Sequence, residues 1–198
     1  MLFHNQHSKL LQTMSSILEN SISVESAHAS LAHEVKVALD RHLCFDTPSL
    51  NVLLDNPSGF AMNYLLGRSC PQCIVITDNP CPEYWDDLWD LRPRALLAGG
   101  HSLDELINAI NRVFKGEIFR KTPFYETPLT IRERQCLMLC ARGLNNAEIA
   151  AALGVKKRTV KNYLTYVYDK LNLKNREQAI LYYWGMWHWL NSLDYQPQ

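Results

Sequence analysis

The 198-residue sequence lacks the features that define several broad classes of protein. It has no apolar run close to the ~18 residues that cross a bilayer, and its start lacks a cationic segment followed by a continuous apolar stretch. Its six cysteines fall short of the density of a disulfide scaffold, and it has no internal repeat or low-complexity tract. We therefore expect a cytoplasmic protein with reduced thiols and no membrane attachment.

The chain also lacks net charge, but its charges are unevenly distributed. Residues 1–128 carry 10 Lys and Arg against 15 Asp and Glu, whereas residues 129–198 carry 10 against 5. An acidic half is thus joined to a basic half, which suits a regulatory domain tethered to a domain that binds a polyanion. The length leaves room for two modest domains, each with its own core.

Residues 145–171 predict two helices joined by a tight turn, a helix-turn-helix pattern. Apolar residues recur at helical spacing, and Gly154 interrupts them where the chain must reverse direction. The other side of the second helix is polar and basic, which suits a major groove because Lys and Asn can hydrogen-bond base edges. The alternative is a surface helix with a solvated run of charge. The inward stripe of the second helix should comprise Val160, Leu164, Val167 and Leu171.

Three blocks at matched spacings carry a family resemblance. They are L-T-I-R-E-R at residues 129–134, G-L-N-N-A-E-I-A at residues 143–150 and T-V-K-N at residues 159–162. From residue 129 to about 181 the chain resembles the DNA-binding domain of the LuxR/NarL/FixJ family of bacterial transcription regulators. The resemblance implies an all-α four-helix module whose third helix enters the major groove and whose fourth can form a dimer contact.

The resemblance also assigns roles to residues of the second predicted helix. Lys161, Asn162 and Thr165 take the base-reading positions, and Thr159 takes a phosphate-contacting one. The sequence departs from the family in having Tyr163 in place of His, and Lys156 where the helix N-cap is usually Ser. Loss of the cap oxygen should weaken the helix start by roughly 1 kcal/mol, and a cation there opposes the helix dipole. A nearby phosphate would offset both effects. The cluster of Lys156, Lys157 and Arg158 is therefore best explained as a site that faces DNA.

Short apolar segments alternate with helical patterns in the first 117 residues, which predicts a parallel sheet covered on both faces. Pro123 and Pro128 punctuate a linker over residues 118–128, so we expect domains at 1–117 and 129–198. We expect strands at residues 22–24, 50–54, 73–77 and 95–98, and helices at 8–20, 26–42, 59–67, 82–91 and from Ser102 to Gly116.

This order resembles a response-regulator receiver domain, an α/β fold with a flavodoxin-like parallel sheet, here with its first strand clipped to residues 1–3. A working receiver needs two acids that hold a cation, a phosphoacceptor Asp, a hydroxyl and a Lys. The acids fall on Asn5 and Gln6, the acceptor on Asp55, the hydroxyl on Thr77 and the Lys on Gly99. Two of the four roles are missing, so we interpret Asp55 as a vestigial phosphoacceptor and expect no cofactor.

Cys70 and Cys73 form a C-x-x-C, which can make a redox disulfide or supply half of a zinc site. No second C-x-x-C or pair of histidines completes a metal site, and Cys73 opens a strand where a small apolar side chain is expected. The structural interpretation is therefore the default, and redox function is the alternative. Cys136 and Cys140 should be core residues.

Two aromatic segments could serve as core or as partner surfaces. Residues 82–91 form an acidic helix that contains Trp85 and Trp89. A final helix should begin at a capping box at residues 175–178 and run through residue 190, with Trp184 and Trp187. Because this helix is apolar nearly all round, one side should face its own domain, and the other should form a dimer contact or dock on the N-terminal domain.

We therefore predict a bacterial-type transcription regulator without catalytic activity, in which a degenerate receiver-like domain precedes a LuxR-type DNA-binding domain. It should bind double-stranded DNA as a homodimer. One alternative is an interaction adaptor that captures a protein partner through its Trp-rich surfaces. Another is a sensor driven by thiol oxidation or by phosphorylation.

Overall fold

The computed structural model describes residues 22–42, 49–68, 70 and 72–186. The chain divides into two compact units. One unit contains the chain up to Asp78 together with Leu91–Thr122, and the other contains Asn79–Asp90 together with the chain from Pro123 onward. Residues 79–90 thus belong with the C-terminal unit, although in the sequence they stand between two strands of the first unit.

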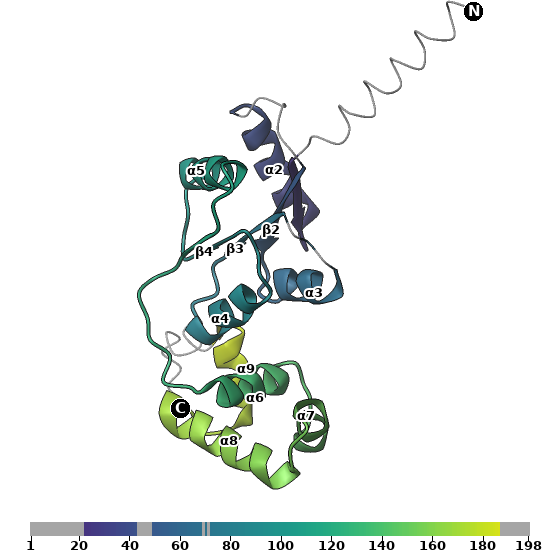
Figure 1. Cartoon of the computed structure of the whole chain (residues 1–198), viewed down its shortest axis with the longest axis vertical. Helices are drawn as coiled ribbons and strands as arrows, with labels where there is room; N and C mark the ends of the chain where they lie inside the picture. The colour runs from purple at the N-terminus through teal and green to yellow at the C-terminus, as the bar shows by residue number, and fades with distance from the viewer. Residues whose placement is uncertain (1–21, 43–48, 69, 71, 187–198) are drawn as a thin grey trace, which may run out of the picture. The chain divides into compact units, whose positions relative to one another are not determined.

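A five-stranded parallel sheet lies at the centre of the first unit (Figure 1). The three inner strands are short runs rich in apolar residues, as expected where both faces of a parallel sheet are covered. All neighbouring pairs are parallel, which confirms the predicted sheet. The strands stand in sequence order across the sheet and are β1 (Ile22–Ser26), β2 (Leu50–Asp55), β3 (Cys73–Thr77), β4 (Ala95–Ala98) and β5 (Phe119–Lys121).

The order of the strands differs from that of a complete flavodoxin-like sheet. In that order, 2-1-3-4-5, the first strand lies between the second and the third. Here the counterparts of the second and third strands are β1 and β2, and they pair directly, with Ile22 opposite Leu50 and Ser26 opposite Leu54. The described sheet therefore has no central strand between them. The strand expected at residues 1–3 and the helix expected at residues 8–20 lie outside the described residues.

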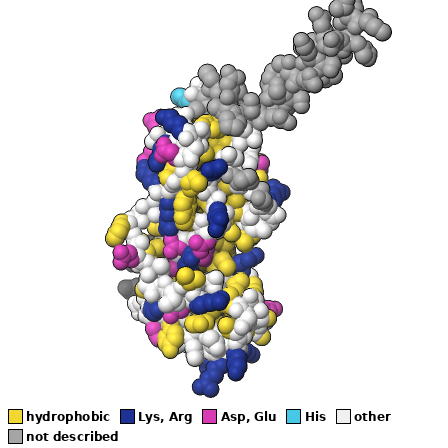
Figure 2. Space-filling model, in the orientation of Figure 1, with side chains coloured by type: hydrophobic (Ala, Val, Ile, Leu, Met, Phe, Trp, Pro, Cys, Tyr) yellow, Lys and Arg dark blue, Asp and Glu magenta, His cyan; other side chains and the backbone are white. Residues whose placement is uncertain are grey.

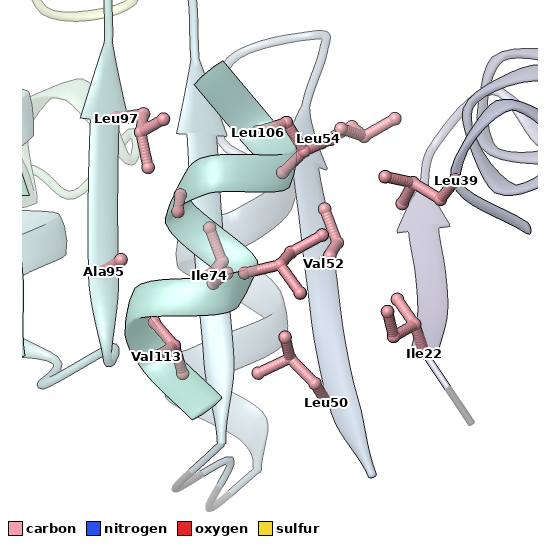
Figure 3. Packing of buried hydrophobic residues seen from close by; sticks show 12 residues of the cluster. Ile22, Leu39, Leu50, Val52, Leu54, Ile74, Ala95, Leu97, Leu106 and Val113 are labelled. Carbon is pink, nitrogen blue, oxygen red and sulfur yellow. The ribbon is translucent and has the colours of Figure 1, made fainter. Parts of the chain in front are cut away.

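Helices α2 (Ala29–Asp40) and α5 (Leu103–Phe114) cover one face of the sheet (Figure 3). Alternate strand residues point toward them, among them Val52, Ile74 and Leu97, all of which are buried. Helix α3 (Phe60–Gly67) lies on the other side (Figure 1). Because burial of each large aliphatic side chain stabilises the fold by roughly 1.5–3 kcal/mol, this cluster holds the carboxyl ends of the strands in place.

Helix α5 begins and ends where the sequence predicts. The Ser102 hydroxyl accepts from the Glu105 N–H (3.2 Å), and the Glu105 carboxylate accepts from the Ser102 N–H (3.2 Å), which makes a capping box. The chain then turns through Gly116, whose φ is +87°. Strand β5 follows, with Phe119 opposite Ala95. The prediction that residues 118–128 are all linker was therefore wrong for residues 119–121, because a three-residue strand is too short to show a period.

The described part of the second unit is helical. Its last helix is shorter than predicted, because it ends at Tyr183 and Gly185 follows with a φ of +77°. The helix expected to run through residue 190 is thus interrupted at residues 184–185, where the backbone turns, and residues 187–190 lie outside the described residues. No described helix is both long and apolar enough to cross a membrane. The helices are α4 (Pro82–Asp90), α6 (Ile131–Ala141), α7 (Asn146–Leu153), α8 (Lys157–Leu171) and α9 (Arg176–Tyr183).

Candidate nucleic-acid interface

Helices α7 and α8 form the predicted helix-turn-helix. Asn145 caps α7, since its Oδ1 accepts from the N–H groups of Ala147 (2.9 Å) and Glu148 (3.2 Å), while the Glu148 carboxylate accepts from the Asn145 N–H (2.7 Å). Gly154 ends the helix in the left-handed region, with a φ of +65°, where a Cβ would be strained. This glycine sets the angle at which the chain enters α8.

The inner face of α8 is an apolar stripe, as predicted. Val160, Leu164 and Val167 are buried, whereas Leu171 is half-buried. Val160 and Leu164 pack with Ile149 of α7 and with the two cysteines of α6. Cys136 and Cys140 are thus core residues, as expected, and burial raises the pKa of Cys136 to about 11. The stripe fixes the rotation of α8 about its own axis.

The outer face of α8 is polar, basic and exposed. Thr165 is also exposed, and its hydroxyl donates to the Lys161 carbonyl (3.0 Å), whereas Thr159 is half-buried. In the part of the chain that the structure describes, none of the basic side chains of this face forms an ion pair, and basic side chains gather at this end of the unit in Figure 2. The exposed residues of the predicted set are Lys156, Lys157, Arg158, Lys161, Asn162 and Thr165.

Tyr166 belongs to the same face, although it is not among the residues predicted from the sequence. It is 53% exposed and lies one helical turn beyond Asn162. Its ring could contact a sugar or a thymine methyl in a groove. The i, i+4 spacing from Asn162 was the signal that could have found it.

The start of α8 has no side-chain cap. Lys156 occupies the N-cap with φ −78° and ψ 146°, and its side chain makes no capping hydrogen bond. The first turn of the helix contains no acidic residue, so cations surround the positive end of the helix dipole. Exposed N–H groups and Lys side chains together form a site that an anion would stabilise.

Two charge-assisted hydrogen bonds connect the helix-turn-helix to the neighbouring helices of its unit. The Lys170 ammonium at the end of α8 lies 2.7 Å from the carboxylate of Glu133, which is also bound by the Thr130 N–H at the start of α6. Burial alone would raise the pKa of Glu133, but the hydrogen bonds from Lys170 and Thr130 outweigh it and lower that pKa. Arg176 of α9 donates to the Leu144 carbonyl, before α7. These contacts link α7 and α8 to the other helices of the unit.

Residues 127–183 match the family described as bacterial regulatory proteins, luxR family. These residues form a luxR-family domain. The match contains α6, α7, α8 and α9, and therefore the capping boxes, the glycine turn and the exposed basic face. The expected four-helix module is confirmed.

Relatives extend the likeness beyond the luxR-family domain. The transcriptional regulatory protein DesR of Bacillus subtilis is 34% identical over 113 residues, which are 54% of this chain and 57% of DesR. The chain thus spans little more than half the length of that relative. The response regulator protein VraR of Staphylococcus aureus is 25% identical over 202 residues, 91% of this chain and 94% of VraR.

A solved structure gives the same fold. RcsB from Salmonella enterica serovar Typhimurium, bound to a promoter, superposes with a TM-score of 0.52 at 18% identity, covering 83% of this chain and 98% of RcsB. At that identity the likeness concerns the fold alone. It agrees with a receiver-like sheet followed by a luxR-family domain.

Helix α4 packs against the luxR-family domain through charged side chains, of which Asp87 and Arg134 are buried and Asp90 is exposed. Arg134 of α6 reaches Asp87 (3.1 Å) and Asp90 (2.6 Å), and the Tyr183 hydroxyl of α9 donates to Asp87 (2.7 Å). Arg134 stands inside the L-T-I-R-E-R block, but nothing in the local pattern indicates its partners. The local sequence therefore gives no sign of this charge network, which connects three helices of the unit.

A second network and an aromatic cluster complete this packing. Glu83 of α4 accepts from the hydroxyls of Thr127 (2.6 Å) and Tyr182 (2.7 Å). The rings of Tyr84, Tyr183 and Trp184 meet edge to face, with centroids 5.2–5.8 Å apart. The aromatic end of α9 is therefore engaged with α4 inside its own unit.

The tryptophans expected as partner surfaces are largely engaged in the same unit. Trp85 is 4% exposed, and its indole N–H donates to the Asn79 carbonyl (2.5 Å). The Trp184 indole N–H donates to the Ala141 carbonyl (2.8 Å), and Trp89 is half-buried. Trp187 lies outside the described residues.

Asp55 lies at the carboxyl end of β2, opposite Thr77 of β3. Its carboxylate accepts from the Thr77 hydroxyl (2.8 Å) and from the N–H groups of Gly59 (3.1 Å) and Ala61 (2.8 Å), at the start of α3. The side chain is buried and serves as a cap for α3. Gly99 ends β4 nearby, since its N–H donates to the Thr77 carbonyl (3.1 Å). The structure thus brings together three of the positions of a receiver site, while Asn5 and Gln6 lie outside the described residues.

Cys70 and Cys73 are free thiols. Burial and the neighbouring Cys70 raise the pKa of Cys73 to about 12, and Cys70 accepts a hydrogen bond from the Asn51 amide (3.1 Å). A thiol with a raised pKa is a poor nucleophile at neutral pH. Among the described residues, no cluster of His, Cys, Asp and Glu has the geometry of a metal site.

Proposed function

We propose that this chain is a sequence-specific transcription regulator that binds double-stranded DNA through α8. The observation that carries the proposal is the outer face of α8, where exposed Lys and Arg side chains without ion-pair partners, together with the exposed Asn162, surround an uncapped helix start. An unpaired cluster of cations is electrostatically unfavourable by itself, and a phosphate backbone stabilises it. The regulatory role is supported by the luxR-family domain and by the relatives DesR and VraR.

The proposed regulator is not controlled by phosphorylation of Asp55. The acidic pair is replaced by Asn5 and Gln6, and the Lys position by Gly99, so the charges that neutralise a cation and a phosphoryl group are missing. The carboxylate of Asp55 is already engaged by Thr77 and by the start of α3. Phosphorylation would have to break these hydrogen bonds without the metal that usually compensates the charge.

The alternatives have weaker support. The adaptor hypothesis needs an exposed Trp surface, but Trp85 is buried and hydrogen-bonded. The thiol-sensor hypothesis needs a reactive thiolate, but burial disfavours that form of Cys73. DNA binding therefore remains the function that the described residues support best.

Selection of binding sites from random DNA, followed by titration of the selected site, tests the proposal. Lys161→Ala or Asn162→Ala should weaken specific binding by about 1–3 kcal/mol and relax base preference at one position per half-site, because these residues face the base edges. Lys157→Ala should weaken binding to all DNA sequences equally. It should also flatten the dependence of binding affinity on salt concentration by about one unit of slope for each phosphate that the protein no longer neutralises. Lys174→Ala is the matched control, since this exposed lysine lies in the same unit but outside α8.

A homodimer is part of the proposal and has its own readout. The selected sites should be inverted repeats whose half-sites lie about 10 base pairs apart, one turn of the duplex. If folded protein returns no enriched motif, sequence-specific regulation is refuted. A protein partner whose capture ignores Lys161→Ala would then favour the adaptor.

A further inference from the structure

A groove of about 480 Å³ lies on the second unit. It is bounded by the start of α4, by residues 123–125, by the end of α8 and by α9. Most of the described residues that line it are aromatic residues or prolines, among them Pro80, Pro82, Trp85, Phe124, Tyr125 and Tyr182. Aromatic side chains are enriched on surfaces that bind another segment of polypeptide. The lining therefore suits an apolar, aromatic stretch of chain.

The rim of the groove holds the most exposed large hydrophobic side chain among the described residues. Phe124 is 94% exposed, and the neighbouring Tyr125 is also exposed. Apolar surface in water is unfavourable in proportion to its area, and exposed apolar residues that adjoin one another mark interaction sites. Within the described residues the groove thus lacks a cover.

The chain leaves α9 at the edge of this groove. Helix α9 ends beside α4 (Figure 1), where the side-chain amide of Asn79 donates to the carbonyl of Tyr183 (3.0 Å). The backbone then turns at Gly185 and packs so closely that a Cβ there would lie 2.7 Å from Cδ of Pro80. Because Pro80 lines the groove, the chain that follows Gly185 begins at its edge.

Residues 187–198 follow and lie outside the described residues. The luxR-family match ends at residue 183, so the family does not account for them. These twelve residues can extend over roughly 40 Å, which is longer than a groove of this volume spans. They include Asp194 but no Lys or Arg, and Lys170 is the charged residue of the described lining. Their apolar side chains are Trp187, Trp189, Leu190, Leu193 and Tyr195.

The tether favours this segment over a partner from solution. A short flexible connection gives a tethered group a local concentration in the millimolar range, without any new contact. The connection here is short, because residue 187 comes two residues after Gly185, which already touches Pro80. A second copy of the chain would have to reach the same groove without that advantage.

We propose that residues 187–198 dock in this groove of their own chain, with their aromatic and leucine side chains against the prolines and aromatic residues of the lining. The docked segment covers Phe124. It also connects α4 to the end of α8, because both elements line the groove. The proposal does not depend on DNA binding.

Hydroxyl-radical footprinting read by mass spectrometry tests the proposal. The full chain is compared with a variant that ends at Met186. Oxidation of Phe124 should be at least about threefold faster in the shortened variant, because its ring loses its cover. Tyr166 is exposed outside the groove and should be oxidised at the same rate in both proteins. Tyr84 is buried in α4 and should stay protected in both, which verifies that the shortened variant is folded.

A substitution in the full-length chain gives a second readout. Phe124→Asp places a charge in the groove at a side chain that is almost fully exposed, so the fold should be retained. Oxidation of Trp187 and Trp189 should then rise by at least about threefold. Ile131→Asp makes the same change at another exposed apolar position of the unit, outside the groove, and should leave both tryptophans as they are in the unmodified chain.

Three results would overturn the proposal. The first is equal oxidation of Phe124 in the full and shortened chains, which would mean that the segment does not cover the groove. The second is unchanged oxidation of Trp187 and Trp189 in Phe124→Asp, which would place the segment elsewhere. The third is protection of Phe124 that disappears on about hundredfold dilution, because docking within one chain is independent of protein concentration. That result would assign the groove to the segment of a second copy.

Discussion

The buried carboxyl of Asp87 should make the second unit less stable as the pH rises. Burial raises the pKa of Asp87 from 3.8 to about 7, although the Tyr183 hydroxyl and Arg134 oppose the rise. Asp90 and Asp86 add repulsion from the same helix. In the unfolded chain this carboxyl should return to an ordinary pKa, because the burial is lost.

The sign and size of the effect follow from these two values. Between about pH 4 and pH 7 the folded chain keeps a proton that the unfolded chain releases, so folding takes up protons and the free energy of unfolding falls as the pH rises. The contribution is greatest below the unfolded pKa and is lost progressively up to the folded pKa. From pH 5 to pH 8 the loss from this group should be about 2–3 kcal/mol.

Urea unfolding of the full chain, followed by tryptophan fluorescence at several values of pH, measures this effect. All five tryptophans belong to the second unit, so the signal reports on that unit. Asp87→Asn removes the titrating group at nearly constant shape and should flatten the pH dependence. Asp169→Asn makes the same change at an exposed carboxyl of α8 and should leave it unchanged.

The comparison of slopes isolates Asp87 from every other titratable group, because those groups are the same in both proteins. Equal pH dependence in Asp87→Asn and in the unmodified chain would refute the argument. A free energy of unfolding that increases from pH 5 to pH 8 would also refute it. That result would mean that the ion pair of Asp87 with Arg134 outweighs burial and lowers the pKa of Asp87.

Three further predictions concern single residues. Acetyl phosphate with Mg²⁺ should leave Asp55 unmodified, as measured by mass spectrometry, because its carboxylate caps α3 and the acidic pair is missing. Asp55→Asn should leave DNA affinity unchanged. Stoichiometric acyl phosphate at Asp55 would contradict this. The Cys70→Ser variant should have the same DNA affinity as the unmodified chain, both with and without reductant, because burial disfavours the Cys73 thiolate. A tenfold effect of reductant on DNA affinity that the substitution abolishes would support a redox sensor instead. Lys156→Ser should raise the free energy of unfolding of the second unit by about 1 kcal/mol, because serine restores the N-cap of α8. The same substitution should weaken DNA binding at low salt. Unchanged DNA affinity would show that Lys156 does not contact DNA.

The sequence by itself determined the elements whose causes are local. The capping residues Ser102, Thr130 and Asn145 bond to groups two or three residues away, and Gly154 needs only its own backbone conformation. The apolar period fixed which side of α8 faces inward. These signals act within one or two turns of chain, so the helix-turn-helix and its basic outer face could be predicted without tertiary information.

Other features depended on which distant surfaces meet. Direct pairing of β1 with β2, the strand at residues 119–121 and the grouping of α4 with the luxR-family domain have no local signature. Arg134 contacts Asp90, which is 44 residues away in the sequence, and Asp87 of the same helix. The unpartnered Nε2 of His101 likewise exists only because the folded chain buries it beside Glu105. Local chemistry determines a helix and its caps, whereas burial, which shifts the pKa of Asp87 and leaves Nε2 of His101 without a partner, is a property of packed surfaces that only the tertiary structure decides.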